Sequence, residues 1–487
     1  MSLARDYTPS LDHAEEQPLF LQLARAVTRD IRAGRLRPGT RLPGTRELAQ
    51  RVGVHRNTAL SAYAELEQQG WITTARARGT FVAQSLPERP VKRPPRVEPA
   101  AERRCRMDLP AFELDAKTHP PDAPLPLVGG MADLRLVPRA ALARAYRRAL
   151  KAPKALGYQN ERGDLRLIAA LRELLGTQRG VLASEDELIV TRGSQMALHL
   201  AARAICSPGD VIAVEAFGYR PAWDGFRLAG AELVPVPVDR GGLRLDALAQ
   251  LAETRRLRAV YVTPHHQYPT TVTMQAGRRL QLLALAERER LFVLEDDYDH
   301  EFHWSGRPVL PLASADPARV VIYCGTLSKV FAPGLRIGYL IARAEVIERV
   351  ARLRARIDRQ GDHVVERAVA ELIEEGELQR HARKVRRLYA ERRECLHQLL
   401  TRELGAALEY ELPAGGLAFW AQFHGAGGVE RFAQAALERG VALQTAQRFT
   451  FDRKAREALR IGFPALTPEE LRRAVKILAA VLREQTG

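Results

Sequence analysis

Short runs of β-branched and apolar residues alternate with helix-like stretches through residues 126–487. These runs are ELIVTRGS (187–194), DVIAVEAF (210–217), RAVYVTP (258–264), LFVLEDDY (291–298) and RVVIYCGT (319–326). Strands that alternate with helices form a mostly parallel sheet with helices on both faces. The sequence therefore predicts an α/β fold for this part of the chain.

Composition divides the 487 residues into three parts. The N-terminal part is basic and rich in helical patterns, whereas the stretch that follows it is rich in proline, with Arg and Lys scattered between. Proline restricts the backbone and lacks an N–H donor, so this stretch favours a semi-stiff linker. We expect a first domain over 1–84, a linker over 85–125 and the α/β domain over 126–487.

The chain is strongly basic, with 74 Lys and Arg against 58 Asp and Glu and a formal net charge of +16. Such a surface favours polyanions, above all nucleic acid. The alternative is a chain that uses arginine heavily everywhere, because arginine is frequent in nearly every segment.

The four cysteines lie far apart and form no CxxC pair: Cys105, Cys206, Cys324 and Cys395. This spacing predicts no disulfide framework and no zinc site, and it fits a reducing cytoplasm. No apolar run reaches the roughly 18 residues of a membrane helix. The first residues, MSLARDYTPSLDHAEEQPLF, lack the apolar centre of a secretory signal. We expect a cytoplasmic protein without a membrane segment or a bound metal.

The N-terminal part has the pattern of a helix-turn-helix. The first helix is expected over 19–34, and its apolar residues recur at helical spacing: Leu23, Val27 and Ile31. Two further helices are expected within 45–71, with Gly53 at the turn between them and an apolar face on the second. That face consists of Ala59, Tyr63 and Leu66. The segment 71–83 is expected to form two strands around an Arg-Ala-Arg-Gly tip.

In this motif the second helix presents its N-terminal residues to the major groove. Four residues there can bond base edges or phosphates: His55, Arg56, Asn57 and Thr58. On the two-stranded wing, Arg76 and Arg78 are expected to reach a phosphate or the minor groove. The alternative is a helical module that binds another protein.

In the α/β domain, TLSKVFAPGLRIGY (326–339) directly follows a predicted strand. Lys329 lies beside hydroxyl groups, and Arg336 comes seven residues later. This arrangement suits a phosphate-bearing cofactor with an aldehyde, in which Lys329 forms the Schiff base while Thr326 and Arg336 hold the phosphate. Taken alone, a lysine at a strand end is more often a solvated charge.

A second motif, LEDDYDHEF (294–302), follows another predicted strand. Asp296 can pair with a pyridine nitrogen and keep it protonated, which makes the ring an electron sink. Tyr298 can donate to the phenolic oxygen of the ring. Asp297 and Asp299 are rivals for these roles, since neighbouring acids can instead be solvated or bind a metal.

Two further segments complete the predicted pocket. In TRGSQMAL (191–198), a Gly-Ser turn opens a helix and exposes backbone N–H groups to a phosphate. The expected contacts are Gly193, Ser194 and Gln195. Tyr219 can stack on the cofactor ring. The alternatives are an ordinary helix cap and an ordinary core aromatic.

The N-terminal motifs resemble the GntR family of winged-helix repressors over residues 17–83. The likeness rests on PGTRLPGTRELA (38–49), GVHRNTALSAYAELEQQGW (53–71) and RGTFV (78–82). Gly44 stands where that family usually has serine, and glycine also caps a helix. The resemblance implies binding to double-stranded DNA and adds Arg46 as a contact.

The remaining motifs resemble fold-type I aminotransferases, and best of all the MocR (GabR-like) subgroup of GntR regulators. The likeness covers about 126–487 and includes TPHHQYPTTVTM (263–274), PAGGLAFW (413–420) and LRIGFP (459–464). It implies pyridoxal 5′-phosphate (PLP) as cofactor and gives four residues the roles described above: Lys329, Asp296, Tyr298 and Tyr219. It also implies that Arg460 clamps the carboxylate of a ligand.

The chain departs from these enzymes at two places. Tyr268-Pro269-Thr270-Thr271 replaces an Asn-Pro-Thr-Gly run whose Asn touches the phenolic oxygen, which leaves Tyr268 at the cofactor. MocR proteins commonly have this form, so the change favours a regulator. Arg220, a further candidate for the ligand carboxylate, stands one position earlier than the matching arginine of similar regulators.

The resemblance implies a PLP-dependent transcription regulator that senses an amine, an amino acid or a B6 vitamer and works as a head-to-tail homodimer. Such a dimer would read two half-sites or direct repeats. The alternative is an active aminotransferase with an appended DNA-binding module, and a third possibility is a sensor of PLP alone. We expect at most residual transaminase activity.

Overall fold

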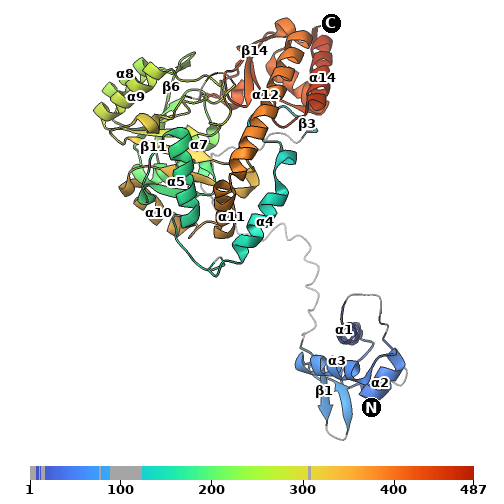
Figure 1. Ribbon diagram of the computed structural model, residues 1–487. Coiled ribbons are helices and arrows are strands. Elements are labelled where there is room, and N and C mark those ends of the chain that lie inside the picture. Colours follow the sequence, from blue (N-terminus) through green and yellow to red (C-terminus); the bar gives the residue numbers. More distant parts are fainter. Residues whose placement is uncertain are drawn as a thin grey trace, which may run out of the picture. The chain divides into compact units, whose positions relative to one another are not determined.

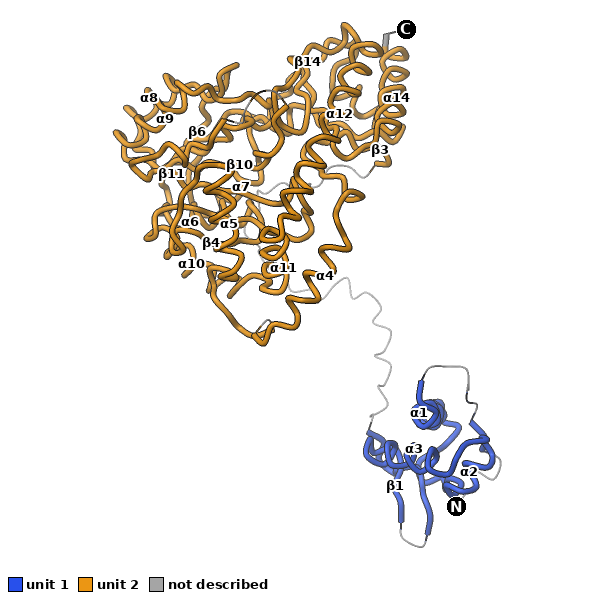
Figure 2. The backbone as a smooth tube through the Cα atoms, viewed as in Figure 1, with its two compact units in different colours: residues 1–111 blue, residues 112–487 orange. Residues whose placement is uncertain are grey.

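The computed structural model describes residues 7–9, 11, 17–75, 78–87, 123–154, 156–304, 306 and 309–486. The chain divides into two compact units, residues 1–111 and 112–487, shown in two colours in Figure 2. Residues 88–122 lie outside the described part, so the linker bounds of 85 and 125 stay a prediction. In the part of the chain that is described, no helix has both the length and the apolar character needed to cross a membrane.

The first unit is a three-helix winged fold. Its elements are α1 (Leu19–Arg32), α2 (Thr45–Val52), α3 (Arg56–Gln68), β1 (Ile72–Ala75) and β2 (Gly79–Val82). The two strands pair antiparallel, with Ile72 opposite Val82. The predicted apolar residues of α1 and α3 are all buried in one cluster: Leu23, Val27, Ile31, Ala59, Tyr63 and Leu66. The predicted apolar faces are therefore confirmed.

The turn between α2 and α3 follows from its end residues. Gly53 ends α2 with φ of 68°, a left-handed conformation that glycine adopts at low cost. His55 caps α3, because its Nδ1 accepts a hydrogen bond from the backbone N–H of Asn57 at 3.2 Å. These two ends fix the point at which the second helix begins and leave its first residues at the surface.

The larger unit contains the predicted α/β fold (Figure 1). Its helices are α4 (Arg139–Leu150), α5 (Leu165–Arg179), α6 (Ser194–Ile205), α7 (Arg220–Leu228), α8 (Leu245–Thr254), α9 (Ala276–Glu289), α10 (Ala344–Ile357), α11 (His363–Glu374), α12 (Glu377–Glu403), α13 (Val429–Glu438) and α14 (Pro468–Thr486). Its strands are β3 (Leu125–Pro126), β4 (Leu188–Thr191), β5 (Val211–Glu215), β6 (Glu232–Val236), β7 (Val238–Asp239), β8 (Gly242–Leu243), β9 (Leu257–Val262), β10 (Phe292–Asp297), β11 (Val321–Thr326), β12 (Gly338–Ile341), β13 (Leu408–Glu409), β14 (Ala418–Phe423), β15 (Val441–Ala442), β16 (Gln444–Thr445) and β17 (Ala458–Gly462).

The central sheet has seven strands in the order β4-β12-β11-β10-β9-β5-β6. Only β12 runs antiparallel to its neighbours, so the predicted, mostly parallel sheet is confirmed. Successive residues of a strand face opposite sides. Accordingly, Leu294 of β10 packs in the apolar cluster of α6, α7 and α10, whereas Val293 packs in the cluster that includes α5 and α9.

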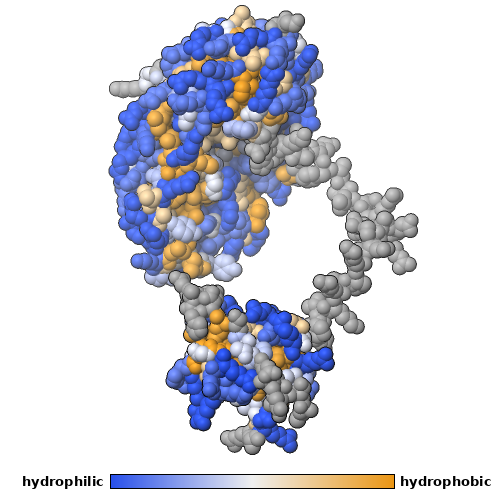
Figure 3. All heavy atoms as spheres, turned by 90° about the vertical axis from the view of Figure 1, so that its right-hand side faces the viewer, coloured by the Kyte–Doolittle hydropathy of each residue, from blue (hydrophilic) through white to orange (hydrophobic). Residues whose placement is uncertain are grey.

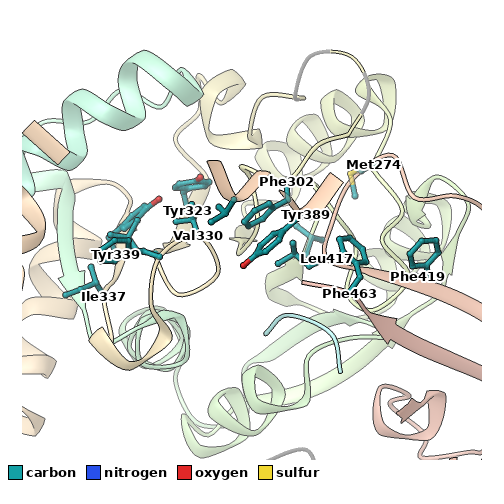
Figure 4. Packing of buried hydrophobic residues seen from close by; sticks show 14 of the residues in the cluster. Met274, Phe302, Tyr323, Val330, Ile337, Tyr339, Tyr389, Leu417, Phe419 and Phe463 are labelled. Carbon is teal, nitrogen blue, oxygen red and sulfur yellow. The ribbon is translucent and has the colours of Figure 1, made fainter. Parts of the chain in front are cut away.

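The C-terminal part builds a second layer beside this sheet. There, β13, β14, β17 and β16 form a four-stranded antiparallel sheet with α12, α13 and α14. Figure 4 shows part of the core, in which Phe302 and Tyr389 lie close together with ring centres 5.5 Å apart. The strand β3 pairs parallel with β15, so the start of the unit is tied to its C-terminal part.

Candidate cofactor pocket and DNA-binding surface

A cavity of about 340 Å³ lies where the central sheet meets the C-terminal part. This volume is within the range of small-molecule sites. Five of the predicted site residues line it: Gln195, Tyr219, Arg220, Tyr268 and Lys329. The other lining residues are Val128, Gly129, Gly130, Met131, Pro221, Asp224, Gln444, Arg448 and Phe449.

Lys329 stands in the turn that follows β11. Its Nζ donates a hydrogen bond to the carbonyl oxygen of Gly130 at 2.9 Å. Burial, and next the positive charge of Arg460, lower the pKa of the Lys329 amine. A lowered pKa raises the fraction of neutral amine, which is the form that condenses with an aldehyde. The lysine is therefore chemically suited to the predicted role.

Asp296 lies near the end of β10, in the strand beside the one that leads to Lys329. Its Oδ2 accepts a hydrogen bond from the hydroxyl of Tyr261 at 2.9 Å, while its buried Oδ1 has no partner among the described residues. Burial raises the pKa of this carboxyl to about 7. A buried carboxylate oxygen without a donor fits the protonated nitrogen of a pyridine ring.

The predicted phosphate contacts lie around the start of α6. Gly193 has φ of 83°, and a Cβ atom there would lie only 2.5 Å from Nη2 of Arg336. The guanidinium of Arg336 donates to the carbonyl oxygen of Arg192 at 2.9 Å, directly beside the first residue of the helix, Ser194. The first N–H groups of a helix lack partners inside it and attract anions. A side chain at position 193 would fill this cradle.

Thr326 contributes in a way that the sequence did not indicate. Its hydroxyl donates to Oγ of Ser328 at 3.0 Å and lies 3.2 Å from the carbonyl oxygen of Ile337. The backbone N–H of Ser328 donates in turn to Oγ1 of Thr326 at 3.1 Å. These bonds close the turn that leads from β11 to Lys329.

Three predicted tyrosines form one aromatic cluster. The ring of Tyr268 meets that of Tyr219 edge to face at 5.5 Å and that of Tyr298 at 5.9 Å. The hydroxyl of Tyr298 donates to the carbonyl oxygen of His266 at 3.0 Å. The hydroxyl of Tyr298 is therefore bonded to the loop after β9, and the ring of Tyr268 contacts both other rings.

Arg460 carries its charge in the interior of the larger unit. Its side chain is fully buried on β17, and its Nε donates to the carbonyl oxygen of Pro269 at 3.3 Å. The guanidinium lies 4.6 Å above the centre of the Tyr268 ring. Neither Nη1 nor Nη2 has a hydrogen-bond partner in the described part of the chain. Because a buried cation without an anion is costly, this site fits a carboxylate ligand.

Arg220 begins α7 and lines the same cavity. Its guanidinium donates to two backbone carbonyl oxygens, of Gln447 at 3.1 Å and of Thr450 at 3.2 Å. A ligand carboxylate would therefore have to compete with these two carbonyl oxygens for the guanidinium of Arg220.

Several pocket residues were not found from the sequence. Gly129 packs against Arg460, since a Cβ atom at position 129 would lie 1.2 Å from Nη1. The side chain of Gln444 accepts a hydrogen bond from the N–H of Gly129 at 3.1 Å. The Gly-Gly pair at 129–130 was a usable signal, as was Tyr261, a hydroxyl in the middle of an apolar strand. Gln444 carries no such signal.

The predicted DNA-contacting residues lie at the surface of the first unit. His55, Arg56 and Asn57 are exposed at the start of α3, and Thr58 is half-buried. Arg46 on α2 and Arg78 beside β2 are also exposed, whereas Arg76 lies outside the described residues. The hydrogen bond that caps α3 also holds the side chain of His55 at the N-terminus of the helix.

Comparison with known proteins agrees with a DNA-binding surface on the first unit and a cofactor pocket in the larger unit. Residues 19–82 match the model of bacterial regulatory proteins of the gntR family, and residues 129–478 match that of aminotransferase class I and II. The chain is 31% identical over 475 residues to a probable rhizopine catabolism regulatory protein, MocR, of Rhizobium meliloti, covering 96% of this chain and 94% of that one. It is 32% identical over 473 residues to the transcriptional regulator TauR of Rhodobacter capsulatus, covering 95% and 96%.

Among solved structures, LysN of Thermus thermophilus, an α-aminoadipate aminotransferase complexed with N-(5′-phosphopyridoxyl)-L-leucine, has the same fold as the larger unit. The TM-score is 0.69 at 28% identity, over 74% of this chain and 92% of that one.

The fold and the site thus define a winged-helix DNA-binding protein with a PLP-dependent aminotransferase domain. The chain belongs to the GntR family of transcription regulators, in its MocR group, and its larger unit belongs to the aminotransferase class I and II family.

Proposed function

We propose that this regulator carries PLP on Lys329 and uses the cavity beside it to sense an amino acid. The observation that carries this proposal is Arg460, a fully buried arginine whose two terminal nitrogens lack partners among the residues described. A carboxylate satisfies both nitrogens at once. A simple amine and a B6 vitamer have no carboxylate, so among the three predicted effector classes the amino acid fits best.

The residues around the cavity divide the recognition of PLP among them. Asp296 holds the ring nitrogen, Tyr219 packs on the ring, and Tyr268 and Tyr298 lie toward its phenolic side. The phosphate is held by Ser194, Gln195, Thr326 and Arg336. Bound PLP supplies an aldehyde that captures a primary amine. Arg460, together with Arg220, then selects those amines that carry a carboxylate.

Sensing requires that the ligand bind one arrangement of the protein better than another. The factor by which the effector changes the affinity for DNA must then equal the factor by which DNA changes the affinity for the effector. On the DNA side we assign contacts to Arg46, His55, Arg56, Asn57, Thr58, Arg76 and Arg78. As a DNA-binding regulator, the protein would act in the cytoplasm.

A head-to-tail homodimer is part of this proposal. Apolar side chains gather in patches on the face of the larger unit that Figure 3 presents. Large exposed apolar residues include Leu134, Leu150, Leu156 and Tyr158, the last two being 82% and 83% exposed. Side chains of this kind favour a surface that a partner covers.

The test is a spectroscopic titration of the full-length, PLP-loaded protein with pairs of ligands, each an amino acid and its decarboxylated amine. For the wild type, an effector amino acid should change the visible absorption of the cofactor at low concentration. Arg460→Gln should require about 10- to 100-fold more of the amino acid, because two charge-assisted hydrogen bonds are lost. The same variant should bind the paired amine as the wild type does.

Arg240→Gln is the matched control, because Arg240 is a highly exposed arginine outside this cavity. Equal weakening for the amine and the amino acid in Arg460→Gln would contradict a carboxylate contact. Absence of any spectral response to every amino acid and amine would contradict the sensing role itself.

An active aminotransferase is the second candidate, and it is favoured by Asp296 and Arg460, which lie near enough to Lys329 to influence the pKa of its amine. The two candidates differ in turnover. A regulator binds the amino acid but does not release keto acid over many turnovers. An enzyme, supplied with an excess of a second keto acid, converts the amino acid to its keto acid repeatedly. Keto-acid release over many turnovers would favour the enzyme.

A further inference from the structure

A cluster of three metal-ligating side chains lies next to the cofactor pocket but on the other side of the sheet. His265 follows β9, Asp297 ends β10, and His300 lies in the turn after β10. One ligand atom from each residue lies within 4.8 Å of the others. All three are buried, with exposed fractions of 3%, 2% and 6%. Because neighbouring residues of a strand face opposite sides, Asp297 points away from the pocket that Asp296 serves.

The cluster contains buried polar atoms without partners. Nδ1 and Nε2 of His265 form no hydrogen bond to any described residue, and neither does Oδ1 of Asp297. A neutral imidazole has one N–H donor and one acceptor, and native proteins rarely bury both unsatisfied. The rings of His265 and His300 are stacked with centres 4.5 Å apart, and one nitrogen of each ring lies within 4.8 Å of an oxygen of Asp297. A bound group in that space would satisfy these atoms.

The charges around Asp297 leave one oxygen free for a ligand. Its Oδ2 accepts a hydrogen bond from Tyr323 at 2.6 Å. The same oxygen lies 3.0 Å from Nδ1 of His300 and 3.4 Å from Nη1 of Arg179. Tyr323 is among the buried residues shown in Figure 4. Arg179 is itself paired with Glu301, so its charge is already balanced. The remaining oxygen, Oδ1, is the one without a partner.

The geometry points to a metal site in which His265, Asp297 and His300 bind one divalent transition-metal ion, with Zn²⁺ as the best match. Two imidazoles and one carboxylate suit zinc in both ligand type and charge. Tetrahedral zinc with bonds of about 2.0–2.1 Å places its ligand atoms about 3.3 Å apart, so the cluster must contract on binding. Rotation of the two histidine side chains can supply this contraction.

This inference revises the sequence-based expectation that the chain holds no metal. That expectation rested on the spacing of cysteines, whereas these ligands come from two separate motifs, TPHHQYP and LEDDYDHEF. A metal ion there would fasten the loop after β9 to the end of β10. The carbonyl oxygen of His266 holds Tyr298, and Asp296 directly precedes Asp297, so the ion would stiffen one wall of the cofactor pocket.

The test is the metal content of the full-length protein without a histidine tag. The protein is treated with a chelator, incubated with excess Zn²⁺, dialysed against metal-free buffer and measured by inductively coupled plasma mass spectrometry. We expect close to one tightly bound zinc per chain in the wild type. His265→Ala and His300→Ala should each bind zinc at least about 10-fold more weakly and lose most of it on dialysis, since removal of even an outer-shell partner of a metal ligand weakens a site by about 10- to 100-fold.

His363→Ala is the matched control, because His363 is equally buried but lies outside the cluster. His265→Gln serves as a second variant that keeps a polar side chain of similar size. Circular dichroism and PLP absorption verify that each variant is folded. Co²⁺ in place of Zn²⁺ gives an independent readout, since a tetrahedral histidine site produces visible absorption that the variants should lose.

The proposal is overturned if the wild type retains no zinc, or if the variants of His265 and His300 retain as much as His363→Ala. Either result would leave ordered water as the group that satisfies the cluster. Because metal content is measured with or without PLP, these outcomes are independent of effector sensing at Lys329.

Discussion

At the scale of single residues, the most instructive contrast lies between two neighbours on β10. Burial raises the pKa of Asp296 to about 7. Burial would also raise the pKa of Asp297, but His300 and Arg179 hold it well below its usual range. The two carboxyls differ because alternation along the strand turns them to opposite faces. Only Asp296 is left with an unsatisfied oxygen on the side of the cofactor pocket.

Replacing Asp296 by asparagine should affect the PLP-free and the PLP-loaded protein in opposite directions. Without PLP, this carboxyl contributes stability fully below its ordinary pKa of about 4, and the contribution is lost as the pH rises through about 7. Asparagine has no charge to desolvate and can still accept the hydrogen bond from Tyr261. At pH about 8 the PLP-free variant should therefore melt a few °C above the wild type, and below pH about 4 this advantage should disappear.

With PLP, Asp296→Asn should bind the cofactor more weakly, because the protonated ring nitrogen loses its anionic partner. Calorimetric melting with and without PLP measures both effects. Asp224→Asn is the control, since Asp224 lines the same cavity but lies beside Arg227. A loss of melting temperature in both forms of Asp296→Asn would contradict the raised pKa.

The candidate site residues that are easiest to predict from the sequence are those in which a reactive side chain follows a strand end. Lys329, Asp296 and Tyr219 were found because each comes soon after an apolar run, and parallel strands bring such ends together. The hydrogen bond from Tyr298 to His266 was not predictable in this way, because it depends on the path of a loop. Nor was Gln444, which comes from the other sheet and reaches Gly129 across more than three hundred residues.

At the scale of elements, the two ends of α3 lie in different surroundings. Its first residues are exposed and capped by His55, while near its other end Glu65 and Gln69 line a groove together with Arg25 of α1. The 13 residues of α3 span about 20 Å, so the two ends are well separated. The helix itself and its apolar face were predictable from periodicity, and the turn from Gly53.

Arg56→Ala should weaken binding to a DNA duplex selected from a random pool by the full-length protein. The expected loss is about 1–3 kcal/mol if Arg56 bonds a base edge, with relaxed specificity at that base pair. If it contacts a phosphate instead, the loss should be similar for every sequence. Fluorescence anisotropy at fixed salt measures both cases. Arg25→Ala is the control, because Arg25 lies toward the far end of α3, and equal losses in the two variants would contradict the recognition-helix assignment.

At the scale of the whole molecule, two units with separate hydrophobic cores carry two different ligands. The core of the first unit consists of residues from α1, α2, α3 and the wing strands, and none of the described residues of the larger unit belongs to it. The division into a DNA-binding part and a PLP part was predictable from motif order and composition. The coupling between them was not, because it depends on how each ligand changes the populations of states, which no single arrangement of atoms specifies.

Because each unit has its own core, the full-length protein should unfold in two calorimetric steps, and PLP should raise only the step of the larger unit. A ligand present at about one hundred times its dissociation constant stabilises the unit that binds it by about 2.7 kcal/mol. For Lys329→Ala this shift should become much smaller, whereas Lys384→Ala, which replaces an exposed lysine of α12, should behave as the wild type does. DNA should raise the other step. If PLP instead raised the melting temperatures of both steps equally in the absence of DNA, the unfolding of the two units would be coupled, which would contradict two independent cores.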